Sequence, residues 1–362
     1  MKKLKAGVLG ATGMVGQRFV SLLERHPWFE LAAVAASPRS AGKRYENAVA
    51  GRWNMQSAVP GMAKGMILKE VEKDMEAISR EVDFVFSALD MEKDEIKKIE
   101  EKYASMGIPV VSNNSAHRWT SDVPMIIPEV NPEHAALIDI QRKNRGWERG
   151  FIAVKPNCSI QSYVPIIKAL ESFNPEKIIV TTLQAISGAG KTFETWPEMK
   201  DNVIPLIGGE EEKSENEPMK VLGKLVEDRI EQAKSPEISA TCIRVPVSDG
   251  HMASISLHLG KEADKESIIN ALGHYKNPIS HLSLPSATKE FIKYFEEPDR
   301  PQTGLDRDFE NGMGITAGRL RKDAIIGWKM VALSHNTLRG AAGGAVLMAE
   351  LLAAKGYIKP NG

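Results

Sequence analysis

Short apolar runs alternate with amphipathic, charged segments through the first half of the chain. Four runs have the length and composition of buried strands: residues 5–10, 29–37, 82–89 and 108–114. Residues 14–26 and 92–107 instead carry apolar side chains at helical spacing. This alternation is typical of a parallel sheet covered by helices. We therefore expect an α/β fold with a doubly wound, Rossmann-like domain over residues 1–155.

The pattern changes near residue 151, where β-branched residues begin to alternate with polar ones. Four such segments follow: residues 176–187, 237–247, 251–260 and 312–321. Alternation of this kind indicates strands with one buried face, so we expect a second, α+β domain over residues 156–334, built on a large mixed or antiparallel sheet. A helix rich in small residues within 335–362 is expected to return to the first domain and complete it.

Composition and charge argue against several classes of function. The 362 residues include 47 Lys plus Arg and 47 Asp plus Glu without a dense basic run, so no nucleic-acid partner is expected. No apolar stretch approaches the roughly 20 residues that a membrane span needs. The start, "MKKLKAGVLG", lacks an apolar signal segment, and the two cysteines are far apart, which favours a cytoplasmic protein without a disulfide framework. Neither CxxC nor HxxxH pairs occur, so no metal site is expected.

The segment "GVLGATGMVGQRF" joins the first strand to the first helix and spaces its glycines as GxxGxxG. Small residues at such a turn let the backbone approach a pyrophosphate, and the helix N-terminus offers free N–H groups to its charge. A tight turn without a ligand is the alternative. The position after the first strand favours a dinucleotide site. We expect it to be formed by Gly10, Ala11, Thr12, Gly13, Met14, Val15 and Gly16.

The end of the second strand indicates which dinucleotide is bound. NAD enzymes usually place an Asp or Glu there, which binds the ribose 2′-hydroxyl. The segment "AAVAASPRSAGKRY" has Ser37, Arg39 and Ser40 instead. A cation and two hydroxyls suit a 2′-phosphate, so NADP is the expected cofactor. A solvated basic loop is the alternative.

Cys158, in "VKPNCSIQ", has the setting of a nucleophile. Asn157 is a good N-cap, so Cys158 is expected in the first turn of a helix over residues 158–173, where the dipole and free N–H groups lower a thiol pKa. The same N–H groups, with the Asn157 amide, could stabilise an oxyanion. Pro165 predicts a kink or an irregular first half. Cys242 lies in an alternating strand and is interpreted as packing.

A thiolate beside a nicotinamide cofactor indicates one reaction class. Acyl-enzyme formation coupled to hydride transfer interconverts an aldehyde and an activated acid. Such chemistry needs an acid/base, and "RVPVSDGHMASI" supplies His251 at a Gly-linked turn between two strands, with Arg244 seven residues earlier. A surface or satisfied core histidine is the alternative for His251.

These segments together resemble the aspartate-semialdehyde dehydrogenases of the archaeal and fungal branch. The resemblance runs nearly end to end, through "GVLGATGMVGQRF", "SPRSAGKRY", "VFSAL", "SNNSAHRW", "VPMIIPEVNPEH", "PNCS", "LQAISGAG", "GGEEEK", "ISATCIRVPVSDGH", "DRPQTGLDRD", "GRLRKD" and "HNTLRGAAGGAV". It implies reduction of aspartyl phosphate by NADPH through a cysteine thioester, giving aspartate semialdehyde and phosphate for lysine, threonine and methionine synthesis. It also implies a homodimer or homotetramer.

Matching motifs carry the family's roles to this chain. The resemblance makes Cys158 the nucleophile and His251 the acid/base, with Gln184 orienting the substrate and Arg244 binding its carboxylate in a bidentate grip. Around the rest of the substrate it places two cations and one carboxylate, which would face the acyl phosphate and the ammonium group: Arg118, Lys213 and Glu210. Beside the cofactor it places Ser87, Ala88, Ser187, Gly188 and Asn336.

Two departures from the family pattern keep alternatives open. Met252 follows His251 where a small residue is usual, and Lys191 in "SGAGKTFETW" adds a cation near the site. Malonyl-CoA reductase, which shares scaffold and thioester chemistry, is therefore an alternative, although Arg118, Lys213 and Glu210 suit a small amino-acid phosphate better. A regulatory nucleotide-binding protein without turnover is a third reading, and it leaves the cysteine and histidine without a purpose.

Overall fold

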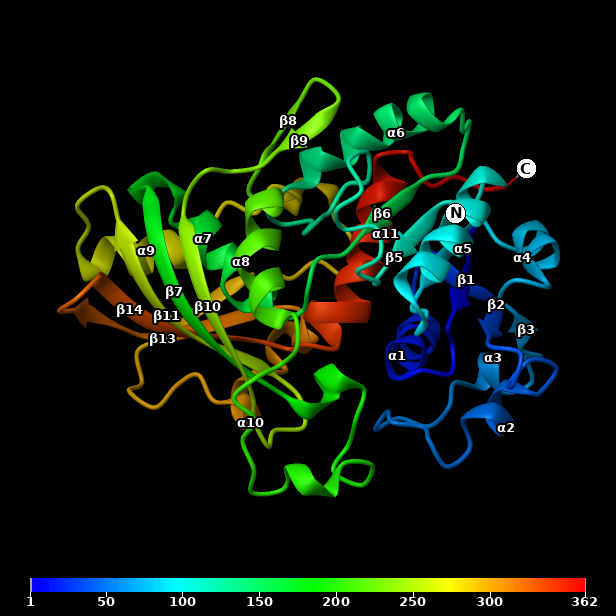
Figure 1. Ribbon diagram of the computed structural model, residues 1–362, viewed down its shortest axis with the longest axis horizontal. Coiled ribbons are helices and arrows are strands. Elements are labelled where there is room, and N and C mark those ends of the chain that lie inside the picture. The colour runs from blue at the N-terminus through cyan, green and yellow to red at the C-terminus, as the bar shows by residue number, and fades with distance from the viewer. Residues whose placement is uncertain (1, 362) are drawn as a thin grey trace.

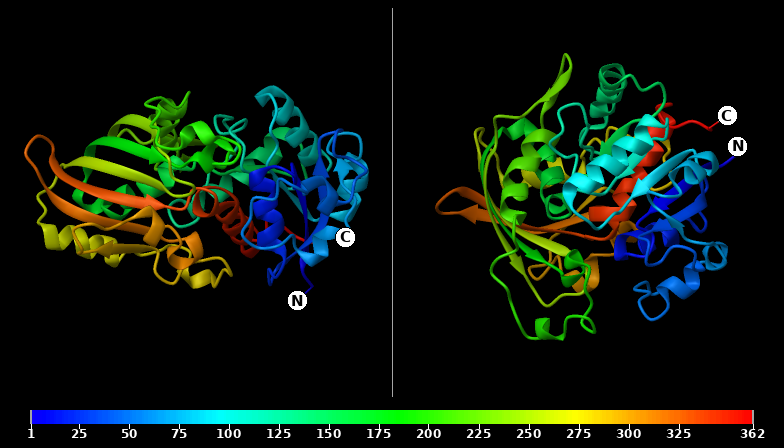
Figure 2. Two further views of the ribbon diagram at one scale, coloured as in Figure 1. Left: turned by 90° about the horizontal axis from the view of Figure 1, so that it is seen from below. Right: turned by 45° about the vertical axis from the view of Figure 1, so that its right-hand side comes forward.

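The computed structural model describes residues 2–361, in which two sheets lie side by side with helices around them, as Figure 1 and Figure 2 show. The first sheet has six strands, all parallel, in the order β3-β2-β1-β4-β5-β6. They are β1 Leu4–Leu9, β2 Phe29–Ala36, β3 Lys69–Glu70, β4 Phe84–Ser87, β5 Val110–Ser112 and β6 Ile152–Val154. This is the strand order of a Rossmann fold, so the predicted doubly wound sheet is confirmed.

Helices cover both faces of this sheet because successive residues of each strand point to opposite sides. Val8 packs with Phe19 of the first helix, whereas Leu9 belongs to a separate cluster with Ile96 and Tyr103 of a later helix. The helices that follow the strands are α1 Met14–Leu23, α2 Tyr45–Val49, α3 Gly61–Lys64, α4 Met75–Glu81, α5 Lys93–Ser105 and α6 Leu137–Arg145.

The second sheet also has six strands, in the order β10-β7-β11-β14-β13-β12. They are β7 Pro175–Gln184, β10 Glu237–Arg244, β11 His251–Leu259, β12 Ile292–Phe295, β13 Ile315–Asp323 and β14 Gly327–Ser334. Two outer pairs, β10 with β7 and β12 with β13, are parallel, and the inner pairs are antiparallel. The sheet is therefore mixed. Of its strands, β12 and β14 were not predicted.

Short helices and one hairpin accompany the second sheet. They are α7 Val164–Ala169, α8 Glu210–Val221, α9 Lys265–Gly273, α10 Thr303–Asp306 and the hairpin strands β8 Lys224–Val226 and β9 Arg229–Glu231. Helix α8 packs along β10 and was not predicted as a helix. No helix within residues 2–361 combines the length and the apolarity that crossing a membrane requires.

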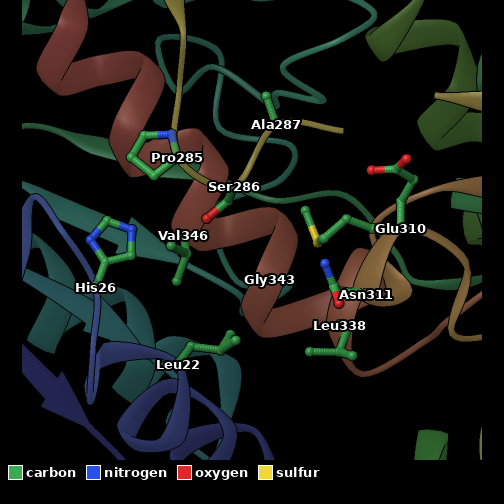
Figure 3. Close-up of a pocket in the computed structure, with 11 residues that line it drawn as sticks. Leu22, His26, Pro285, Ser286, Ala287, Glu310, Asn311, Leu338, Gly343 and Val346 are labelled. Atoms are coloured by element: carbon green, nitrogen blue, oxygen red, sulfur yellow. The ribbon is translucent and has the colours of Figure 1, made fainter. Parts of the chain in front are cut away.

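The C-terminal segment leaves β14 and crosses to the first sheet. It begins with a π-helical stretch, Leu338–Ala342, and continues as α11, Gly343–Ala354, whose leucines and alanines join the cluster on the α1 face of the first sheet. Glu350 of α11 is buried and accepts hydrogen bonds from His26 (2.7 Å) and from the Ser286 backbone N–H (2.9 Å). A cavity of about 230 Å³ lies at this junction. Figure 3 shows His26 and Ser286 among the residues that line it.

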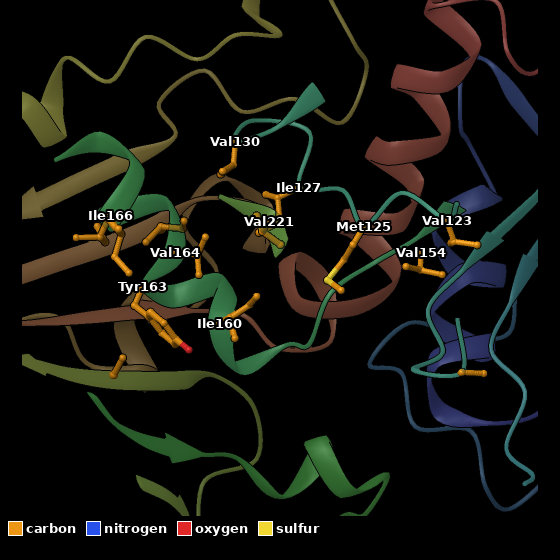
Figure 4. Packing of buried hydrophobic residues seen from close by; sticks show 14 of the residues in the cluster. Val123, Met125, Ile127, Val130, Val154, Ile160, Tyr163, Val164, Ile166 and Val221 are labelled. Carbon is orange, nitrogen blue, oxygen red and sulfur yellow. The ribbon is translucent and has the colours of Figure 1, made fainter. Parts of the chain in front are cut away.

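An apolar cluster connects the two sheets and fixes the segment that carries Cys158. Figure 4 shows Ile160 and Tyr163, just after Cys158, in the same cluster as Met125 and Val154. All four side chains are fully buried. The segment between β6 and α7 is thus held in the core on both sides of the cysteine.

Candidate active site

Cys158 lies just beyond the carboxyl end of β6, immediately before a 3-10 turn, Ser159–Ser162. The N-cap of this turn is Cys158, not Asn157 as predicted, but the Asn157 side-chain oxygen accepts hydrogen bonds from the backbone N–H and the hydroxyl of Ser159, both at 2.7 Å. The segment expected to be a helix over residues 158–173 has the irregular first half that Pro165 predicted: a 3-10 turn comes first and α7 follows it. Because Pro165 has no N–H, it is tolerated in the first turn of α7, which begins only at Val164.

The expected lowering of the Cys158 pKa is also wrong. Burial of the sulfur raises the pKa of the thiol to about 11, and the nearby Glu210 carboxylate acts in the same direction. The charges of Lys155, Arg118 and Arg244 oppose this effect without cancelling it. A four-residue 3-10 turn also has too few aligned peptides for a strong dipole. The resting thiol is therefore protonated at neutral pH.

His251 contacts the thiol from the start of β11. Its Nε2 lies 3.5 Å from the Cys158 Sγ, and its Nδ1 accepts the Ala185 backbone N–H at 3.1 Å. An Nδ1 that accepts leaves the proton of a neutral imidazole on Nε2, facing the sulfur. Burial, and then the charge of Arg244, lower the pKa of His251 to about 3. In this tautomer the His251 Nε2–H faces the Cys158 sulfur and can donate a hydrogen bond to it.

Strand pairing brings Arg244 and Gln184 to the same edge of the second sheet. They are the last residues of β10 and β7, which run parallel and pair these two residues directly. The Arg244 Nη1 donates to the Ala185 carbonyl at 2.6 Å. Gly188 fits between Arg244 and His251, because a Cβ there would lie 2.9 Å from the guanidinium and 3.1 Å from the imidazole. Any larger residue at 188 would displace one of the two side chains.

Glu210 is the polar centre of the site. This first residue of α8 is only 8% exposed and accepts hydrogen bonds from three side chains. The donors are the Asn157 amide (3.0 Å), the Lys213 ammonium (2.7 Å) and the Gln184 amide (3.5 Å). The predicted residues therefore converge, but the Asn157 amide N–H points to Glu210, not toward an open oxyanion position.

Arg118 has a buried partner that the sequence did not reveal. Its Nη1 donates to Glu217 at 2.8 Å, and both side chains are buried. Glu217 also accepts the Asn157 backbone N–H at 2.6 Å. A signal for Glu217 exists in the sequence, since its spacing from Glu210 and Ser214 places all three on one face of α8. That face is polar, so no apolar periodicity marked the helix.

Cations gather around a cavity of about 470 Å³ at this end of the site. Arg118 and Lys213 line it together with Lys93 from the start of α5, and Trp119 lies at its exposed rim. Two carboxylates, Glu212 and Glu217, also line the cavity, so its wall is mixed in charge, with three cations against two anions.

The glycine loop has the geometry of a dinucleotide cradle. A Cβ at Gly10 would lie 2.2 Å from the Ala88 carbonyl oxygen, and one at Gly16 would lie 2.1 Å from the Gly10 oxygen, so only glycine fits at either position. Gly13 is the N-cap of α1 and provides no side-chain cap, which leaves the first N–H groups of the helix for an anion. A cavity of about 260 Å³ lies over this loop. Among the residues that line it are Gly10, Thr12, Gly13, Ser37, Arg52, Glu70 and Ala88.

The other residues predicted to bind the cofactor differ in burial and in hydrogen-bond partners. Arg39 is exposed and Ser40 is buried, while Arg52, which was not predicted, donates to the Ser40 hydroxyl at 3.5 Å. Ser87 is buried and accepts a hydrogen bond from the Asn114 amide at 2.9 Å. Ala11 lies buried in the turn itself, with Val15 just after it in α1.

The nicotinamide end of the expected cofactor site lies between the two sheets. The Asn336 amide nitrogen donates to the Ser187 hydroxyl, and its oxygen accepts the Gly250 backbone N–H, both at 2.8 Å. Met14 and Ser187 line a neighbouring cavity of about 190 Å³ together with Lys191. Among residues 2–361, no group of three or more His, Cys, Asp or Glu side chains is arranged to hold a metal ion.

Comparison with known proteins agrees with this geometry. Residues 5–138 match the family model "Semialdehyde dehydrogenase, NAD binding domain", and residues 164–339 match "Semialdehyde dehydrogenase, dimerisation domain". The chain is 45% identical to the aspartate-semialdehyde dehydrogenase of Archaeoglobus fulgidus, covering 97% of this chain and 98% of the relative. It is 43% identical to that of Saccharomyces cerevisiae, covering 98% of each.

Solved structures show the same similarity. The Candida albicans aspartate-semialdehyde dehydrogenase with NADP superposes with a TM-score of 0.87 at 39% identity, over 99% of this chain and 100% of that one. Aspartate-semialdehyde dehydrogenase II of Vibrio cholerae complexed with ASA gives a TM-score of 0.75 at 26% identity, over 98% and 99% of the two chains.

Proposed function

Since the chain belongs to the aspartate-semialdehyde dehydrogenase family of NADP-dependent oxidoreductases, we propose that the site around Cys158 converts L-4-aspartyl phosphate into L-aspartate 4-semialdehyde and phosphate. The observation that carries this assignment to particular residues is the contact of 3.5 Å between the Cys158 Sγ and the His251 Nε2, with the charges of Arg244 and Glu210 acting on the same sulfur.

Three groups of residues hold the substrate in this proposal. Arg244 presents its guanidinium fork to the α-carboxylate, and Glu210 faces the ammonium group. Arg118 and Lys213 line the adjoining cavity and bind the phosphate. Gln184 and Asn157 donate to Glu210 and so position that carboxylate.

The chemistry divides between the sulfur and the imidazole. The Cys158 sulfur attacks the acyl carbon, a C–S bond forms, and the C–O bond to phosphate breaks, which leaves a thioester. The S–H bond breaks in the same step, and its proton leaves with the phosphate. NADPH, when bound, supplies the hydride that reduces the thioester carbonyl carbon. The His251 Nε2–H donates a hydrogen bond to the carbonyl oxygen as it gains negative charge. When the C–S bond breaks, this oxygen re-forms the C=O bond of the aldehyde, and the released Cys158 thiolate regains a proton from water.

The cofactor fits the cradle described above. The loop from Gly10 to Gly16 would hold the pyrophosphate through backbone N–H groups, and Ser37, Arg39 and Ser40 would meet the 2′-phosphate. Ser187, Gly188 and Asn336 would lie beside the nicotinamide, close to His251.

Reduction of malonyl-CoA is a weaker candidate for this site. Glu210 is held by three donors at the substrate end, and its carboxylate suits an ammonium group that malonyl-CoA lacks. A direct comparison of aspartyl phosphate with malonyl-CoA as oxidants of NADPH separates the two activities.

We also propose the division of the chain and its assembly. Residues 1–155 with 335–362 would form the NADP-binding domain, and residues 156–334 the catalytic and dimerisation domain. The outer face of the second sheet, where Ile179 of β7 is 52% exposed, supports a homodimer or homotetramer. The two free cysteines fit a cytoplasmic location. Light scattering on wild type and Ile179→Asp tests the interface.

The nucleophile is tested by substitution and mass spectrometry. Cys158→Ala should abolish turnover while retaining NADP binding, and quenched wild-type enzyme should carry the acyl group on Cys158. Cys242→Ser is the matched control, because Cys242 is fully buried against Ser214 and should affect stability only. An active Cys158→Ala enzyme would refute the proposal.

A further inference from the structure

Both cations that the proposed function assigns to the phosphate are already paired with a carboxylate. The Arg118 Nη1 donates to Glu217 at 2.8 Å, and the Lys213 ammonium donates to Glu210 at 2.7 Å. Both acidic residues are buried, since Glu217 is 1% exposed and Glu210 is 8% exposed. The formal charges of the two pairs sum to zero. A phosphate at this end of the site therefore meets donors whose charge is already balanced.

Asn157 joins the two ion pairs directly before the nucleophile. Its backbone N–H donates to Glu217 at 2.6 Å, and its side-chain amide donates to the two oxygens of Glu210 at 3.1 and 3.0 Å. Glu210 has a part in the proposed function, because it faces the ammonium group of the substrate. Glu217 has none, although it lines the same cavity of about 470 Å³ as Arg118. Its carboxylate therefore belongs to the wall of the space that the phosphate would occupy.

The Arg118 guanidinium has three acceptors, and only one of them is charged. Its Nε–H donates to the Lys155 carbonyl at 3.0 Å, its Nη2 donates to the Asn113 carbonyl at 3.4 Å, and its Nη1 donates to Glu217. Two of the five N–H groups of the guanidinium remain for a ligand. The two carbonyls help to fix the direction of the fork, whereas the charge is balanced by Glu217 alone among these three acceptors.

Burial decides which charges of the cavity wall act most strongly on an anion. Lys93 and Glu212 also line the cavity, but both are exposed, so water and salt screen their charges. Glu217 is buried, so its repulsion of an anion on Arg118 is screened much less. The identity of the anion matters here, because phosphate is the leaving group of the first step. Phosphate that stays bound can attack the thioester and re-form the acyl phosphate.

We propose that the Glu217 carboxylate keeps the affinity of the Arg118 site for phosphate low, so that phosphate leaves once the thioester has formed. Glu217 neither gains nor loses a bond in this role, because it balances the charge of the guanidinium that holds the leaving group. The inference rests on the proposed function, which supplies the phosphate, and it adds a residue to which that function gives no part.

Glu217→Gln tests the inference, because it removes the charge and keeps the shape of the side chain. In the direction that consumes aspartate semialdehyde, NADP and phosphate, the KM for phosphate should fall about tenfold. The KM values for the other two reactants should change by about twofold or less. Phosphate should also inhibit the forward reaction at about a tenth of the concentration that inhibits wild type. A merely structural role would raise several KM values together.

Two further variants separate charge from shape and from position. Glu217→Asp keeps the charge on a shorter side chain, so its KM for phosphate should stay within about threefold of the wild-type value. Glu212→Gln is the matched control, because it removes a carboxylate from the same cavity wall at an exposed position. Its KM for phosphate should stay within about twofold of the wild-type value.

Phosphate affinity is also measured without turnover. The thermal midpoint rises once the phosphate concentration exceeds the dissociation constant, whatever the stability of the free protein. In Glu217→Gln this rise should begin at about a tenth of the phosphate concentration that wild type needs. The measurement includes a variant that folds only in phosphate, because the concentration at which folding returns reports its affinity.

A phosphate KM in Glu217→Gln at or above the wild-type value would overturn the inference, and so would a thermal midpoint that begins to rise at the wild-type concentration. An equal fall in Glu217→Asp and Glu217→Gln would assign the effect to shape and overturn it too. These results leave the proposed function intact, because wild type still converts aspartyl phosphate. An active Cys158→Ala enzyme would instead remove the proposed function itself.

Discussion

The buried pair of Arg118 and Glu217 gives the sharpest prediction about the stability of the site. Glu217→Gln keeps the shape of the side chain and removes its charge. The Arg118 guanidinium, whose side chain is 8% exposed, then has no counter-charge, and the amide nitrogen of the new glutamine can face its Nη1. The Asn157 backbone N–H keeps an acceptor only if the remaining amide oxygen turns toward it.

The expected loss follows from the distance of 2.8 Å between the Arg118 Nη1 and the Glu217 Oε1. Coulomb's law with an effective dielectric constant of about 20 gives an attraction of about 6 kcal/mol at that separation. Breaking one partner of a buried pair typically costs about 3–5 kcal/mol, because the other charge stays buried. We therefore expect the free energy of unfolding to fall by about 3–5 kcal/mol.

Urea unfolding at one fixed protein concentration measures this loss. Glu212→Gln is the matched control, since Glu212 lies on the same helix, is exposed, and should change the free energy of unfolding by less than about 0.5 kcal/mol. Inorganic phosphate should restore part of the stability of Glu217→Gln, because an anion on Arg118 replaces the missing carboxylate. Equal unfolding midpoints for both variants would refute the importance of the pair.

Three further predictions concern pH, cofactor and substrate. Burial lowers the pKa of His251 to about 3, so as the pH decreases the unfolded chain binds this proton before the folded chain does. The free energy of unfolding should therefore fall as the pH decreases from about 6.5 toward 3, and it should fall less steeply in His251→Gln. Equal slopes in the two proteins would contradict this prediction. Arg39→Ala should weaken NADP binding more than NAD binding by about 1.5–3 kcal/mol in calorimetry, and an equal loss would show that Arg39 does not contact the 2′-phosphate. Arg244→Lys should chiefly raise the substrate KM in steady-state assays, and an unchanged KM would remove the carboxylate clamp.

The sequence predicted best those elements whose buried positions carry apolar side chains. Strands β1, β2, β4 and β5 are largely buried and read as continuous apolar runs, so these four strands of the first sheet were predicted, whereas the short strands β3 and β6 were not. Helix α8 was missed because its buried face carries Glu210, Ser214 and Glu217, and polar periodicity does not indicate burial.

The residues of the site were easier to predict than their protonation. The motifs and the family resemblance supplied Cys158, His251 and Glu210, and the fold brings them together. The pKa of the Cys158 thiol is raised, although we expected it to be lowered. Burial of the sulfur raises it, and so does the carboxylate of Glu210, which lies 52 positions later in the sequence. Such terms depend on which distant segments meet, and local sequence does not encode them.

Helix α11 has a consequence for how the enzyme is made. Ten of its twelve residues are buried, most of them against the first sheet, and Gly340 just before it packs on Cys158. After residue 155 leaves the ribosome, translation at about 5–20 residues per second delays residue 354 by roughly 10–40 s. During that interval the first sheet exposes an apolar face, and a chaperone that covers such surfaces has time to act. The nucleophile reaches its reactive setting only at the end of synthesis.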